Sequence, residues 1–308
     1  MLISAAFGLY MGDVEVTLDK LFGMLMLGPF GKTDDVFLQS VVWQIRFPRV
    51  LSTIISGAVL AASGVAYQSV LRNPLAEPYT LGVASGAAFG AACAIIAGLP
   101  GVSAAAFAGS IASLFIVWIL GERKNAPDIS RIILAGVIVG SILSAGLTFL
   151  KALAGDRVSV IVIWLMGSFS AANWLDVFPL TLGLFVLLLF CASNMNEMDI
   201  MASGTNAASL GLDLSTRRLL ILGSASFAVS FVVSRFGIIG FVGLVIPHIL
   251  RILFGPSHRS LIPLSLIGGG ALLCAADTLA KMLNEIPAGV LTVLIGGPVF
   301  CAILWNRG

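Results

Sequence analysis

Long apolar runs separated by short polar turns make up almost the whole chain. The clearest example covers residues 46–90: two arginines flank a proline, an apolar run follows at 50–70, and a turn broken by two prolines leads to a second apolar run at 81–97. About 20 apolar residues are enough to cross a bilayer as an α-helix. This segment therefore predicts a helical hairpin through a membrane.

The same alternation repeats along the chain and predicts eight to ten spans. Residues 1–11 are apolar but too short to cross, so we expect the outer part of a first span there. Residues 13–44 carry several acidic side chains and predict an external loop with some helix, and 151–173 predict an interfacial segment with tryptophans. The remaining predicted spans are 102–120, 129–150, 177–193, 217–234, 261–280 and 286–305.

Glycines recur at helical spacing inside two of these runs. Gly82, Gly86 and Gly90 fall on one helix face, and Gly136 and Gly140 repeat the interval. Small residues at this spacing allow helices to approach closely in lipid. Between 235 and 251 glycine recurs every third residue and a proline follows, which predicts a break in the helix that is tolerated only inside the protein or along a cavity.

Composition excludes a soluble globule. Of the 308 residues, 58% are hydrophobic and only 10% are charged, against about 25% charged in soluble domains. The net charge of +2 gives no sign of a nucleic-acid partner, and the charges on the two sides of the predicted spans do not settle the orientation. Each of the four cysteines stands alone in an apolar run, which predicts helix packing and no disulfide framework.

No motif indicates that the chain binds a nucleotide or acts as an enzyme. Gly31-Lys32-Thr33 looks like the end of a phosphate-binding loop, but Met26 stands where that motif needs its first glycine. ATP and Mg²⁺ must then be bound by another chain, and we expect no cofactor or metal here. An ion-coupled secondary transporter is a remote alternative that would use Asp277 and the broken segment near Gly240. An intramembrane enzyme would need a catalytic arrangement that the predicted spans do not contain.

Several short motifs along the chain together resemble the FecCD-type permeases. This family supplies the membrane subunits of type II ATP-binding-cassette (ABC) importers for iron–siderophores, haem and cobalamin. Within this family the chain is similar to the cobalamin permease, and the resemblance covers nearly the whole chain. The matching motifs are Arg46-Phe47-Pro48-Arg49, Gly64 with Gln68, residues 72–78, residues 81–87, residues 240–248 with Arg251, Asp277, residues 286–289 and residues 296–300.

The resemblance implies an all-α fold, a transmembrane bundle of about ten spans with residues 1–308 as one permease domain. It implies a multi-pass protein of the bacterial or archaeal cytoplasmic (inner) membrane with both termini cytoplasmic. It also implies three kinds of partner: a second permease copy, two ATPase subunits, and a periplasmic or lipid-anchored substrate-binding protein.

The resemblance also implies roles for particular residues. Arg46 and Arg49 match a basic pair at the external mouth that accepts acidic side chains of the binding protein, and Lys281 stands where the family has an arginine. Residues 194–216 match the cytoplasmic coupling segment, with a short helix expected at 205–210. The coupling residues are Ser203, Gly204, Thr205, Asn206, Ala207, Ala208, Leu210 and Gly211. The cytoplasmic gate is assigned to Asp128, Ile129 and Ser130. Asn73, Pro74, Glu77 and Pro78 are expected to build a rigid turn.

The sequence is compatible with several substrates. An iron–siderophore is the first expectation, because it is the commonest role in the family. Cobalamin is the alternative, since residues 42–46 and 245–251 look similar to cobalamin permeases. Haem and oxyanions such as molybdate are further candidates.

Overall fold

The computed structural model describes residues 1–12, 14–29, 31, 35–121, 129–203 and 214–305. All regular structure in these ranges is helical. In chain order the helices are α1 (Leu2–Tyr10), α2 (Leu18–Leu27), α3 (Val36–Ser40), the π-helical η1 (Val41–Arg46), α4 (Phe47–Val70), α5 (Val83–Ala97), α6 (Val102–Gly121), α7 (Ile129–Leu153), the 3₁₀ turn η2 (Gly155–Arg157), α8 (Val158–Leu165), α9 (Trp174–Ser193), α10 (Met195–Ser203), α11 (Leu214–Phe236), α12 (Val242–Phe254), α13 (His258–Met282) and α14 (Ala288–Trp305).

The helices match the predicted spans closely. Within the described residues, 6 helical segments are long and apolar enough to cross a membrane, and three shorter apolar helices, α5, α12 and α14, accompany them. The predicted span at 102–120 is α6, and the run at 1–11 forms the short α1. Helix α4 begins at Phe47 and continues directly from η1, so Arg46 and Arg49 both lie within helix.

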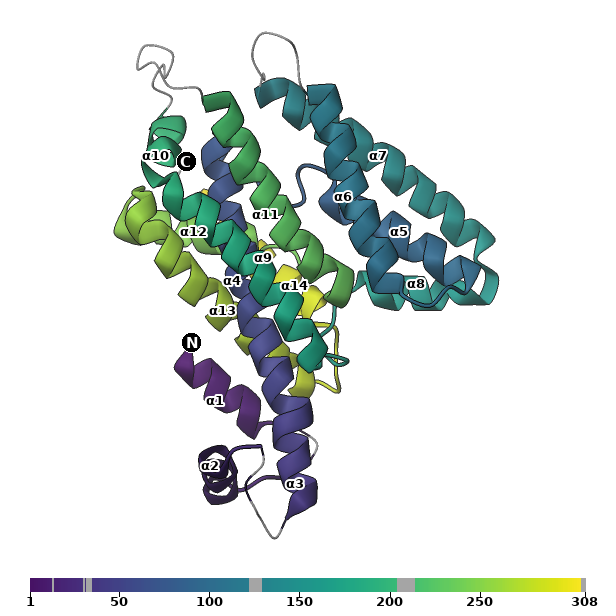
Figure 1. Ribbon diagram of the computed structural model, residues 1–308, viewed down its shortest axis with the longest axis vertical. Coiled ribbons are helices and arrows are strands. Elements are labelled where there is room, and N and C mark those ends of the chain that lie inside the picture. The colour runs from purple at the N-terminus through teal and green to yellow at the C-terminus, as the bar shows by residue number, and fades with distance from the viewer. Residues whose placement is uncertain (13, 30, 32–34, 122–128, 204–213, 306–308) are drawn as a thin grey trace.

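Helix α4 lies at the centre of the bundle (Figure 1). In its most apolar window 83% of residues are buried, against 22% in α6 and 17% in α7. Helices α9, α11, α12 and α13 all pack against α4. The outer helices therefore present their apolar side chains to lipid, and α4 is the element on which the others are assembled.

Glycines bring the backbones around α4 into contact. Gly57 of α4 faces Gly269 of α13, and Gly64 faces Gly243 of α12. A Cβ atom added at any of these four positions would overlap backbone or side-chain atoms of the facing helix. In a bilayer, apolar side chains gain little free energy by moving from lipid into a helix interface. Such close packing is therefore a main source of helix association there.

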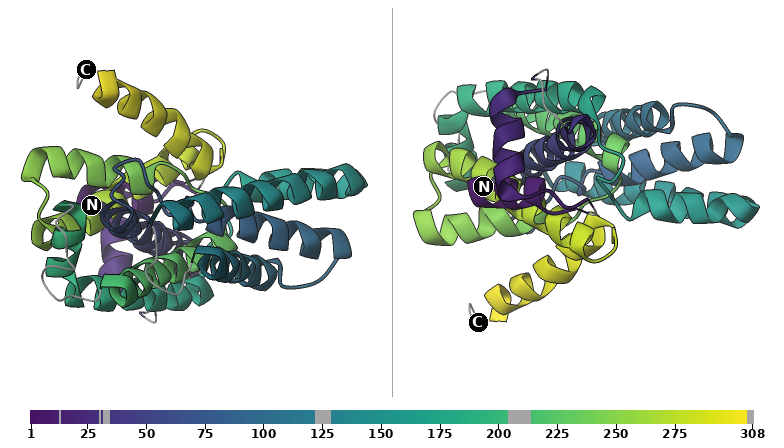
Figure 2. Two further views of the ribbon diagram at one scale, coloured as in Figure 1. Left: turned by 90° about the horizontal axis from the view of Figure 1, so that it is seen from above. Right: turned by 90° about the horizontal axis from the view of Figure 1, so that it is seen from below.

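Helices α5, α6 and α7 form a second group that projects to one side, while α14 stands apart on another (Figure 2). Gly86 and Gly90 of α5 lie against Gly109 and Ala105 of α6, which confirms the predicted packing face. Gly82 has a different role, because it adopts a left-handed conformation (φ 77°) at the start of α5.

The break predicted near residue 240 is present and is held by the turn after α4. Gly237 and Phe241 adopt positive φ between α11 and α12. The hydroxyl of Tyr79 donates to Ile239 O (2.8 Å) and accepts from Ile239 N (3.2 Å). The turn therefore supplies hydrogen bonds that a broken helix would otherwise lack inside a membrane.

The turn itself is built by the residues that the sequence singled out. The side-chain oxygen of Asn73 accepts from Leu75 N at 2.9 Å, and the Glu77 amide donates to the Thr80 hydroxyl. The ring of Pro78 lies against Gly243 of α12. The turn thus connects the end of α4 to the start of α12 as well as to α5.

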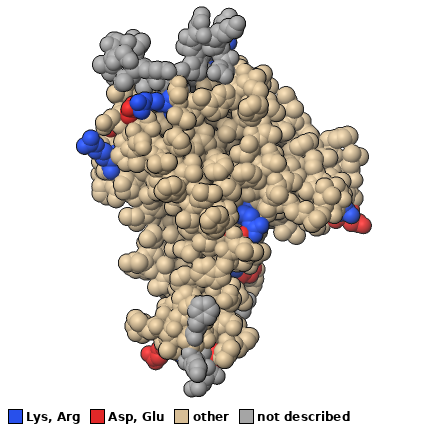
Figure 3. All heavy atoms as spheres, in the orientation of Figure 1, with Lys and Arg blue, Asp and Glu red and all other residues tan. Residues whose placement is uncertain are grey.

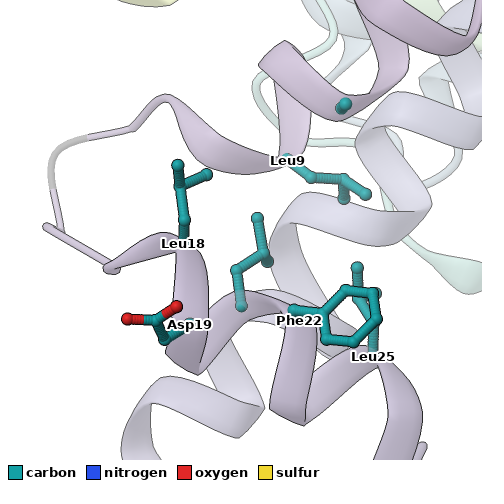
Figure 4. Close-up of a pocket in the computed structure, with 7 residues that line it drawn as sticks. Leu9, Leu18, Asp19, Phe22 and Leu25 are labelled. Carbon is teal, nitrogen blue, oxygen red and sulfur yellow. The ribbon is translucent and has the colours of Figure 1, made fainter.

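The short helices α1, α2 and α3 lie at the end of the bundle opposite to α10 (Figure 1). A pocket of about 600 Å³ opens between α1 and α2, lined mainly by apolar side chains such as Leu9, Leu18, Phe22 and Leu25 (Figure 4). The indole of Trp43 donates to Met24 O and stacks on Phe47. This contact fixes α2 against the outer end of α4.

The glycine contacts around α4 give a stability prediction. We expect Gly64→Ala to lower the free energy of unfolding by roughly 1–3 kcal/mol, because the added methyl group would overlap the Gly243 carbonyl and force the backbones apart. Thermal unfolding of the purified protein in detergent measures the effect. Gly23→Ala is the matched control, since a Cβ there meets nothing within 4 Å. Equal midpoints for the two variants would contradict the packing argument.

Candidate functional site

Charged side chains collect near the ends of the helices and leave most of the visible surface uncharged (Figure 3). Two clusters stand out at opposite ends of α4. The arginine cluster consists of Arg46, Arg49, Asp277, Lys281 and Glu285. The α10 cluster consists of Ser69, Arg72, Asp199, Arg217 and His258.

Arg49 is the centre of the arginine cluster. Its Nε and Nη2 donate to the two carboxylate oxygens of Asp277 (2.9 and 3.0 Å), and its Nη1 and Nη2 donate to those of Glu285 (2.8 and 2.7 Å). The side chains of Arg49 and Asp277 are only 8% and 3% exposed, whereas that of Glu285 is 41% exposed. One guanidinium group therefore joins a buried carboxylate of α13 to an exposed one in the turn after it.

The other two basic side chains of this cluster also bond inside the protein. Arg46 donates to the carbonyl oxygens of Leu9 and Tyr10, both at 2.8 Å, and to Val14 O. Lys281 donates to Gly8 O at 3.0 Å and lies 3.9 Å from Asp277, which is one helical turn earlier on α13. Together these contacts hold α1 and the segment after it against α4 and α13.

The three residues predicted to receive a binding protein are thus not an open basic patch. Arg46 is 4% exposed, Arg49 is 6% exposed, and the Lys281 side chain is 7% exposed. The physical reason is that charged groups placed among apolar helices are stable only when they are paired and hydrogen-bonded. Their role in docking stays a prediction.

Glu285 sits on an unusual turn. Asn284 and Glu285 both adopt left-handed backbone conformations, with φ of 58° and 60°. The hydrogen bonds from Arg49 lower the pKa of the Glu285 carboxyl below its ordinary value, against the opposing effect of partial burial. Glu285 is therefore held as a carboxylate on Arg49.

At the other end, α10 packs as a small amphipathic helix. Met198 and Met201 are fully buried, and Ser203 at its last position is exposed. The short helix predicted at 205–210 lies outside the described residues, and α10 was not predicted from the sequence. The spacing of Met198 and Met201 within a polar stretch was the signal that could have revealed it.

Three helices are fixed to α10 by polar contacts. Arg72, just after α4, donates through Nε to Met201 O at 2.9 Å. Arg217 of α11 forms an ion pair with Glu197 at 3.1 Å. The backbone amide of His258, the first residue of α13, donates to Asp199 Oδ1 at 3.1 Å. Any displacement of α10 is therefore communicated to α4, α11 and α13.

His258 lies between a serine and an aspartate, in an order that resembles a hydrolase triad. Its Nδ1 contacts Asp199 Oδ1, and its Nε2 shares a hydrogen bond with the Ser69 hydroxyl. Ser69 is only 1% exposed and His258 is also 1% exposed. A nucleophile must reach its substrate, so this buried arrangement serves as a structural joint between α4, α13 and α10. Nothing in the sequence around His258 indicates this joint.

The remaining predicted site residues fall partly outside the described part of the chain. Of the predicted gate, Asp128 is not described, while Ile129 and Ser130 begin α7 and Ser130 is exposed. Of the predicted coupling residues, only Ser203 is described, and its hydroxyl donates to Ile200 O. Gly204, Thr205, Asn206, Ala207, Ala208, Leu210 and Gly211 lie outside the described residues. Both assignments stay predictions.

The buried ion pair gives a second stability prediction. We expect Arg49→Met to lower the free energy of unfolding by about 3–5 kcal/mol, because it leaves the Asp277 carboxylate buried without its main partner. Adding Asp277→Asn should recover most of that loss, since the buried charge is then removed. A double-mutant cycle by thermal or denaturant unfolding measures the coupling. Additive losses in the double variant would show that the two side chains do not depend on each other.

The contacts of α10 give a prediction for local stability. We expect Asp199→Ala to speed amide hydrogen exchange in α10 by about tenfold, because its carboxylate fixes both the backbone and the ring of His258. Asn196→Ala is the control on the same helix, since the contact of Asn196 with Arg259 is exposed and long at 3.4 Å. Equal exchange in the two variants would mean that Asp199 does not hold α10 in place.

Comparison with known proteins agrees with this geometry. The model of the FecCD transport family matches residues 1–306. The cobalamin import permease BtuC of Halobacterium salinarum is 39% identical over 87% of this chain and 74% of its own length. The molybdate import permease MolB of Haemophilus influenzae is 32% identical over 99% of this chain and 93% of its own.

A solved structure shows the same architecture. It is an inward-facing structure of an ABC transporter assigned to the metal-chelate type, with a TM-score of 0.88 and 30% identity, covering 99% of this chain and 96% of its own. The family match and this likeness confirm the predicted fold class. The chain belongs to the FecCD transport family and is a multi-pass permease subunit of an ABC importer in the cytoplasmic membrane, a transport protein and not itself an enzyme.

Proposed function

We propose that this chain forms the pathway through which an ABC importer carries a bulky metal chelate, with an iron–siderophore as the first substrate to test. The observation that carries this proposal is the likeness to the metal-chelate type transporter along 99% of the chain. Two separate ATPase subunits would bind ATP and Mg²⁺ and drive the transport. A second copy of the permease would complete a central pathway as a homodimer.

The distribution of charge supports a wide pathway with little chemical selectivity. Only 10% of the residues are charged, and the charged side chains of the two clusters are engaged with one another or with backbone groups. Substrate selection would then fall to the external binding protein. The ion pair between Arg49 and Asp277 argues against an ion-coupled carrier, because the Asp277 carboxylate already accepts two hydrogen bonds from Arg49.

The α10 end is the surface that we assign to the ATPase subunits. Segment 194–216 leads out of α9 and into α11, and α10 within it is connected to three spans. Closure of the ATPase subunits on ATP would displace this segment and tilt α4, α11 and α13, which changes the side of the membrane to which the pathway opens. We assign the cytoplasmic gate to Asp128, Ile129 and Ser130, of which Ile129 and Ser130 are the first residues of α7.

Cobalamin is the second candidate substrate. The observation in its favour is the 39% identity to a permease named for cobalamin import. Haem remains a third candidate within the same class. All of these are large metal complexes, so one pathway could accept any of them and the permease residues alone do not discriminate.

The proposal predicts a substrate-dependent ATPase. We expect the complex reconstituted with the ATPase and binding protein encoded beside it to hydrolyse ATP several-fold faster with one loaded binding protein. Ferric siderophores, cobalamin, haem and molybdate form the test panel. Because the ATPase acts through the permease, Asp199→Ala should reduce the stimulation more than Asn196→Ala does. Stimulation by molybdate alone would reject the metal-chelate assignment, and failure to assemble with any ATPase would reject the importer function for this chain.

A further inference from the structure

We propose that the Glu285 carboxylate fills a carboxylate-binding site on Arg49, and that an acidic side chain of the external binding protein displaces it on docking. This inference rests on the proposed function, because it assumes that a binding protein docks at this end. It assigns Glu285 the role of an internal competitor that sets the affinity of docking.

The geometry of Arg49 provides the site. A guanidinium group can hold two carboxylates, each through two parallel hydrogen bonds. Asp277 occupies one edge with its side chain 3% exposed, and Glu285 occupies the other with its side chain 41% exposed. The buried carboxylate belongs to α13 and cannot leave without a large cost. The exposed one can leave, because water can solvate it.

The charge count explains why the vacated site would attract a carboxylate. Arg46, Arg49 and Lys281 contribute three positive charges to the cluster, and Asp277 and Glu285 contribute two negative charges. Withdrawal of Glu285 raises the excess from one positive charge to two, in a position with little access to water. An incoming carboxylate restores the original balance and takes over the hydrogen bonds to Nη1 and Nη2 of Arg49.

The turn that carries Glu285 favours its release. Left-handed backbone costs a residue other than glycine about 1 kcal/mol or more, and here two such residues follow one another, Asn284 and Glu285. The neighbouring Met282, Leu283 and Ile286 are exposed and contribute little burial. The bonds to Arg49 are therefore the main contacts that hold this conformation, and their loss would let the turn relax.

Release of the turn would have a structural consequence. Residues 283–287 connect α13 to α14, and α14 stands away from the rest of the bundle in both views of Figure 2. A carboxylate that replaces Glu285 would thus uncouple the start of α14 from α4. Docking of the binding protein is in this way linked to the position of a helix that leads to the opposite end of the molecule.

The test compares two variants with the same chemical change. In lipid nanodiscs that hold the complete complex, we expect Glu285→Gln to tighten binding of the substrate-binding protein about tenfold, because an internal competitor that occupies the site lowers the apparent affinity. Glu15→Gln, an exposed glutamate near the same end, should leave the affinity unchanged. Glu285→Ala should reproduce the gain, and Arg49→Gln combined with Glu285→Gln should abolish it.

A second measurement does not require the binding protein. Amide hydrogen exchange of the permease alone should become faster at residues 283–286 in Glu285→Gln, with little change in α4. Unchanged exchange there would show that the bonds to Arg49 do not hold the turn, and would overturn the inference.

The outcomes separate this inference from the proposed function. If the binding protein stimulates the wild-type complex but binds Glu285→Gln with equal or lower affinity, the competitor role of Glu285 is wrong and the importer function stands. If no binding protein stimulates the wild-type complex, the proposed function fails and the inference fails with it.

Discussion

The close approach of α4 to α12 and α13 is the constraint on which the rest of the structure depends. Where Gly57 meets Gly269 and Gly64 meets Gly243, backbone lies directly on backbone. A membrane offers little hydrophobic gain for bringing helices together, so association must come from such packing and from polar contacts. The break before α12 is possible because the turn after α4 supplies its hydrogen bonds. A transporter can therefore contain an irregular segment next to its most buried span.

The two polar clusters show how the same helix is connected to the ends of the molecule. At one end Arg49 binds carboxylates that lie 228 and 236 residues further along the chain. At the other end Ser69 and Arg72 connect α4 to α13 and α10. Helix α4 thus links the surface assigned to the binding protein with the surface assigned to the ATPase. Helix α13 takes part in the same two clusters through Asp277 and His258, so the partners can influence each other through α4 and α13 together.

Local signals predicted the fold well and long-range contacts poorly. The length of the apolar runs, the polar turns and the glycine spacing at Gly86 and Gly90 sufficed to place the helices, because each depends on neighbouring residues. The burial of Arg49 could not be predicted, since nothing near it in the sequence reveals Asp277 or Glu285 as partners. His258 was missed for the same reason. Helix α10 was missed because a nine-residue segment is too short to give a clear helical period, although Met198 and Met201 have the spacing of one helix face and are both buried.

The most direct test of the central claim is uptake of the labelled chelate into proteoliposomes that contain the permease, its ATPase and the loaded binding protein. The account predicts uptake that requires hydrolysable ATP on the ATPase side and continues when all ion gradients are collapsed. Uptake driven by an ion gradient in vesicles that contain only this chain would contradict it, and would identify the protein as a secondary transporter.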